Sequence, residues 1–93
     1  MKRSIEFARS FIRLYRKLPP NAKDKVNETV ESLIISIESA RVSPGVGLKR
    51  LKKDIWEARV NIDLRISFEM TGSLIKFLVV GGHDEICKFL KNI

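Results

Sequence analysis

The chain has 93 residues, of which 44% are hydrophobic, and its 18 lysines and arginines against 11 aspartates and glutamates give a formal net charge of +7. This length suits one domain, residues 1–93, and excludes a second core. A single cysteine excludes an internal disulfide. With no signal-peptide pattern and no apolar run of about 18 residues, we expect a soluble, cytoplasmic protein without membrane contact. The charge favours a nucleic-acid partner, RNA rather than DNA, and the alternative is an acidic protein.

The first half predicts a strand and two helices. Residues 2–7 partly alternate, which indicates a short edge strand. Apolar residues then recur at helical spacing from Phe7 to Leu18, and Pro19 and Pro20 end this helix because proline cannot donate to the helical ladder. Asn21 is expected to cap a second helix that runs to about residue 40. The two apolar stripes predict an antiparallel helix hairpin packed on a sheet.

The second half predicts three antiparallel strands, preceded by a loop at 43–47 and a basic run at 48–53. Residues 56–62 and 64–70 alternate between apolar and polar, and residues 74–80 form a nearly continuous apolar strand, typical of a sheet interior. A short tail or helix ends the chain. The expected fold class is α+β, with the hairpin on a small, mainly antiparallel, twisted sheet.

Two groups of cations are candidate phosphate ligands. The first is the basic run, with Lys49, Arg50, Lys52 and Lys53. The second is Arg59 with Arg65, which the predicted turn brings together on the polar faces of neighbouring strands. Like charges side by side cost stability, and planar guanidinium groups match phosphate oxygens, so we expect an anion between them. The alternatives are a solvated surface for the run, and neutralisation of the arginines by Glu57, Asp63 or Glu69.

His83 is the only histidine and follows two glycines at the end of the apolar strand. An imidazole can give or take a proton near neutral pH, although lone histidines are more often structural. Asp84 could orient the ring or cap the tail helix. Together the cations and His83 suit metal-independent RNA cleavage, in which the ribose 2′-hydroxyl attacks the phosphate. His83 and Cys87 alone are too few ligands for a metal site, and no cofactor motif is visible.

Four segments in order carry a family resemblance. They are Phe11…Tyr15…Lys17-Leu18-Pro19, Pro44-Gly45…Leu48-Lys49-Arg50-Leu51-Lys52, Trp56-Glu57-Ala58-Arg59-Val60…Asp63-Leu64-Arg65-Ile66-Ser67-Phe68, and Val80-Gly81-Gly82-His83-Asp84-Glu85. Over nearly the whole chain this arrangement resembles the RelE/ParE toxin superfamily. The resemblance implies a β-α-α-β-β-β fold and the toxin of a type II toxin–antitoxin pair. It also implies an acidic antitoxin as partner, held in a hetero-oligomer that often represses its own operon.

Within that family the RelE-like branch cuts mRNA in the ribosomal A site, and the ParE-like branch inhibits DNA gyrase. The resemblance assigns Arg59 and Arg65 to the scissile phosphate, the basic run to mRNA or ribosomal RNA, and His83 to catalysis. Two positions depart from the family. Cys87 replaces a tyrosine of many relatives, and Val46 stands near the place of a general-base glutamate, so that His83 would carry more of the proton transfer.

Three functional hypotheses follow. The first is a ribosome-dependent mRNA endonuclease, for which alanine at either arginine should relieve growth arrest and leave the fold intact. The second is a non-enzymatic inhibitor of gyrase or of another acidic protein. The third is a degenerate, non-toxic relative that binds nucleic acid or antitoxin.

Overall fold

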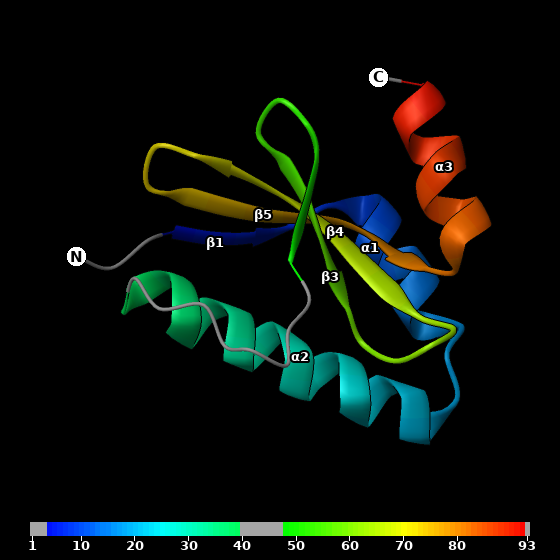
Figure 1. Ribbon diagram of the computed structural model, residues 1–93. Helices are drawn as coiled ribbons and strands as arrows, with labels where there is room; N and C mark the ends of the chain where they lie inside the picture. The colour runs from blue at the N-terminus through cyan, green and yellow to red at the C-terminus, as the bar shows by residue number, and fades with distance from the viewer. Residues whose placement is uncertain (1–3, 40–47, 93) are drawn as a thin grey trace.

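The computed structural model describes residues 4–39 and 48–92, which form a five-stranded sheet with helices on both faces (Figure 1). The elements in chain order are β1 (Ser4–Phe7), α1 (Arg9–Arg16), α2 (Pro20–Glu38), β2 (Lys49–Lys52), β3 (Ile55–Arg59), β4 (Arg65–Thr71), β5 (Leu74–Gly81) and α3 (His83–Lys91). The α+β class is confirmed, as are the opening strand, the helix pair and a C-terminal helix.

The sheet has the strand order β1-β5-β4-β3-β2, with β1 parallel to β5 and every other pair antiparallel. β5 lies between two strands, β1 and β4, as its nearly continuous apolar sequence predicts. The β4–β5 hairpin turns at Gly72, whose φ of 56° is a left-handed conformation that suits glycine.

One prediction about the strands is wrong, because the basic run forms β2, a fourth strand after the helices. β2 is the outer strand of the sheet and pairs with β3, Lys49 lying opposite Glu57. Its charged side chains are exposed and only Leu51 packs inward, so the strand carries no apolar alternation. The predicted loop at 43–47 lies outside the described residues.

The helix boundaries also differ from the prediction at two points. Phe7 belongs to β1, opposite Phe77, and α1 starts after it. Pro20 is the first residue of α2 and Pro19 precedes it, so Asn21 is not the cap. Proline suits the first helical position because the N–H that it lacks has no partner there in any helix.

The core has two parts, one on each face of the sheet. The larger lies between the helix pair and one face and contains Phe11, Val26, Leu33, Ala58, Ile66, Phe68, Ile75, Phe77 and Val80. The smaller lies under α3 on the other face and contains Ile55, Leu78, Val79 and Ile86. None of the described helices is long and apolar enough to cross a membrane.

Candidate functional site

The two strand arginines lie directly opposite each other at one end of the sheet. Arg59, the last residue of β3, is paired in register with Arg65, the first residue of β4, and Arg65 is paired in turn with Gly81 of β5. Because α3 begins two residues after Gly81, the register brings His83 to the same end of the sheet. A Cβ on Gly82 would lie 3.6 Å from the carbonyl oxygen of Asp63, so the β3–β4 connection runs beside this junction.

The site occupies the face of the sheet that α3 partly covers. Successive side chains of a strand point to opposite faces. Since Ala58 and Ile66 enter the core under the helix pair, Glu57, Arg59 and Arg65 point to the other face.

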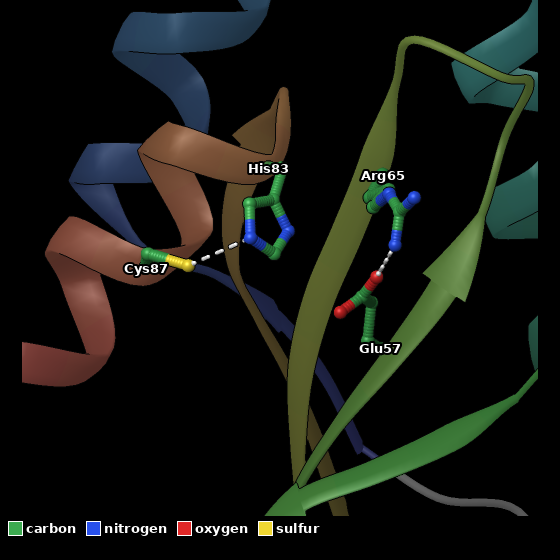
Figure 2. Close-up of polar contacts among 4 residues, drawn as sticks. All are labelled: Glu57, Arg65, His83 and Cys87. Carbon is green, nitrogen blue, oxygen red and sulfur yellow. Dashed lines mark hydrogen bonds and ion pairs between the residues drawn. The ribbon is translucent and has the colours of Figure 1, made fainter.

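Glu57 occupies part of the expected phosphate site. Its Oε1 accepts a hydrogen bond from Nη1 of Arg65 at 2.8 Å, and Glu57 as a residue is only 7% exposed (Figure 2). The sequence left two possibilities for the arginines, a bound anion or neutralisation by a carboxylate, and for Arg65 the structure shows neutralisation by Glu57. Arg59 is exposed and has no ion pair within the described residues. Within the described residues, the Arg65 guanidinium is thus held by an ion pair and the Arg59 guanidinium is not.

His83 opens α3 with an exposed side chain, and its only side-chain hydrogen bond in the described part of the chain joins Nε2 to Sγ of Cys87 at 3.3 Å. Figure 2 shows the ring between Cys87 and β4, with its other nitrogen facing the strand that carries Arg65. No hydrogen bond joins Asp84 to the ring among these residues, and its carboxylate lies in the first turn of α3, where it complements the helix dipole.

Gly81 lets α3 pack closely on the end of the sheet. A Cβ at this position would lie 2.8 Å from Cβ of Glu85, closer than side-chain carbons approach. The glycine therefore fixes where the first turn of α3, and with it His83, sits relative to the strands.

The basic run does not form one surface. Lys49 and Lys52 are register partners of Glu57 and Ile55, so they share the face of the site, whereas Arg50 is the partner of Trp56 and belongs to the opposite face. Nε of Arg50 also donates to the carbonyl oxygen of Lys53 at 2.7 Å, where Lys53 has a φ of 49°. Within the basic run, Lys49 is the residue that lies directly opposite Glu57 on the neighbouring strand.

Sequence reasoning missed two parts of this site. It treated Glu57 only as a possible neutraliser, although its place between Trp56 and Ala58 put it on the same face as both arginines. It considered Cys87 only as a metal ligand and as a family departure, although four residues from His83 is one helical turn. No three His, Cys, Asp or Glu side chains gather as a metal site in residues 4–39 and 48–92, and Val46 lies outside this part.

Comparisons with known proteins identify the fold. No protein-family model matches the sequence, and neither does any curated protein. The structure is similar to the Escherichia coli DinJ–YafQ toxin–antitoxin complex (TM-score 0.76, 19% identity, 90% of this chain and 96% of that one). It is also similar to the RelB–RelE antitoxin–toxin complex of Methanococcus jannaschii (0.69, 19%, 90% and 96%). A third similar structure is the YoeB/ParE toxin of Agrobacterium tumefaciens (0.67, 15%, 86% and 98%). The chain has the fold of RelE/ParE-type toxins.

Proposed function

We propose that this chain is the toxin of a type II toxin–antitoxin pair and a metal-independent, ribosome-dependent mRNA endonuclease that acts in the cytoplasm. The observation that carries the proposal is the register of Arg59, Arg65 and Gly81, which gathers two guanidinium groups and an imidazole at one end of an open sheet face. The fold, shared with YafQ and RelE, supports the same conclusion.

The chemistry assigns one role to each side chain. Arg59 and the remaining donors of Arg65 bind the non-bridging oxygens of the scissile phosphate and stabilise the charge that develops on them. The ribose 2′-oxygen forms a bond to phosphorus and passes its proton to the Glu57 carboxylate. The bond from phosphorus to the 5′-oxygen breaks, and His83, which enters this step as the imidazolium, gives that oxygen a proton and becomes neutral. The products are a 2′,3′-cyclic phosphate and a 5′-hydroxyl end.

The cleanest test replaces Arg59, because it is exposed and bears no ion pair in the described structure. With ribosomes carrying a message, Arg59→Ala should lower the cleavage rate by about 10²-fold, as for loss of one charge-stabilising donor. Arg13→Ala, which removes another exposed arginine, this one on α1, should cleave like the wild type. Mapping of message ends measures both. Equal rates for Arg59→Ala and the wild type would refute the mechanism.

A second candidate is a non-enzymatic inhibitor of DNA gyrase, or of another acidic protein. The Arg65–Glu57 ion pair favours it, because it occupies one nitrogen of the expected phosphate ligand. Inhibition of gyrase supercoiling by wild-type chain, without cleavage of ribosome-bound message, would favour this candidate.

We further propose that an antitoxin covers the groove between α1 and α2. Apolar side chains of both helices and of β1 line this groove, including Phe7, Ile12, Val30 and Ile34, and its volume is about 530 Å³. Phe7 and Ile12 are 44% and 38% exposed. An apolar groove of this kind, next to the exposed basic side chains of α1 at Arg9, Arg13 and Arg16, suits an acidic chain with an amphipathic segment.

A further inference from the structure

We infer that Cys87 is a positioning residue for His83, whose thiol determines which imidazole nitrogen carries the proton. Its consequence for catalysis rests on the proposed nuclease function. The two residues lie one turn apart on α3, and the distance from Sγ to Nε2 is 3.3 Å, within the range of a hydrogen bond to sulfur.

The thiol is the donor in this contact. A thiol sulfur is a weak acceptor, whereas the unprotonated nitrogen of a neutral imidazole accepts well, so S–H···N is the better arrangement. When Nε2 accepts, the proton of the neutral ring lies on Nδ1.

The same contact orients the ring for proton transfer. With Nε2 held toward Cys87, Nδ1 lies on the side of β4 and Arg65 (Figure 2). When the ring takes up a second proton and becomes the imidazolium, its Nδ1–H therefore faces the strands, gives its proton to the leaving 5′-oxygen and leaves a neutral ring. His83 is exposed, and the contact with Cys87 is its only side-chain hydrogen bond in the described structure, so this hydrogen bond is the polar contact that restrains the ring. Cys87 is itself half-buried, and its neighbour Ile86 is anchored in the smaller core.

The chain offers a direct test because it has one histidine. Long-range ¹H–¹⁵N spectra, recorded where the imidazole is neutral, distinguish Nδ1–H from Nε2–H in a single ring. We expect mainly Nδ1–H in the wild type and in Cys87→Ser, which keeps a donor, and a shift toward Nε2–H in Cys87→Ala. Identical tautomer populations in the wild type and Cys87→Ala would overturn the inference. Backbone amide spectra check that each variant is folded.

Cleavage assays separate this inference from the proposed function. Cys87→Ala should lose at least about tenfold in cleavage rate, part of what a positioned proton donor contributes, and Cys87→Ser should recover it. If the tautomer shifts but wild-type chain cleaves no message, the nuclease proposal fails and the positioning role stands. If the wild type cleaves and Cys87→Ala matches it in rate and tautomer, the positioning role fails alone.

Discussion

Arg65→Ala should destabilise the fold much more than Arg59→Ala, although the two arginines are neighbours in the same sheet. Arg65 is the ion-pair partner of Glu57, which is 7% exposed, whereas Arg59 is exposed and unpaired among the described residues. Truncation of Arg65 leaves a buried carboxylate without its cation, and that state costs more than the pair itself contributes.

The structure bounds the size of this effect. At a separation of 2.8 Å the attraction between unit charges is about 6 kcal/mol for an effective dielectric constant of about 20. Desolvation of both groups offsets most of it, and the Arg65 side chain is still 27% exposed, so water screens the pair. We therefore expect Arg65→Ala to cost about 2 to 3 kcal/mol in unfolding free energy, below the range for fully buried pairs, and Arg59→Ala under about 0.5 kcal/mol.

Urea unfolding followed by the fluorescence of Trp56, the only tryptophan, measures these differences. With a slope of about 1 to 3 kcal/mol per molar urea, the expected loss moves the midpoint well outside experimental error. The double variant Glu57→Gln/Arg65→Ala is the control, because it also removes the unpaired carboxylate charge. Its unfolding free energy should exceed that of Arg65→Ala by about 1 kcal/mol or more. Equal midpoints for the two alanine variants, or no recovery in the double variant, would refute this reasoning.

Two further measurements test the geometry of the site. Gly81→Ala should cost about 1 to 3 kcal/mol, the range for overpacking, because its Cβ would lie 2.8 Å from that of Glu85. Gly82→Ala, whose Cβ would have ordinary contacts, should cost less in the same urea assay, and the reverse order would contradict the packing of α3. For single-stranded RNA, Lys49→Gln should lower the slope of log affinity against log salt by about 0.7, the value for one lost phosphate contact. Arg50→Gln, on the other face, should leave the slope unchanged, and an anisotropy series that shows equal slopes for both variants would refute the division of the basic run.

The larger elements of the fold could be predicted because their sequence periods are strong. The apolar spacing of α1 and α2 and the nearly continuous apolar run of β5 require burial, which helices packed on a sheet provide. β2 could not be predicted in the same way, because an outer strand with three exposed cations has no apolar period. Its partner β3 defines it through main-chain pairing, which depends on no side-chain pattern. Ile62 shows the opposite error, since it continues an alternating pattern but lies 84% exposed beyond the end of β3.

The site was predictable as far as strand register determines it. The short link between β3 and β4 requires Arg59 and Arg65 to be close, and the two glycines place His83 next to them. The burial of Glu57 was not predictable, because an alternating strand pattern indicates the face on which a side chain lies and not how much of it the packed neighbours cover. For the same reason the expectation that alanine at either arginine spares the fold is retained for Arg59 only.

Folding alone does not explain why a carboxylate and a guanidinium lie on this face. Ser67, opposite Glu57 in the register, is fully buried, and its hydroxyl has no hydrogen-bond partner among the described residues. Apolar residues would fill the same space without desolvating charges, and such replacements of buried ion pairs are often neutral or stabilising. On the face of the same strands that the helix pair covers, the core residues are apolar: Ala58, Ile66 and Phe68. The buried polar residues of β3 and β4, Glu57 and Ser67, therefore lie on the face that also carries Arg59 and His83, where the proposed RNA cleavage would use a carboxylate and an oriented cation.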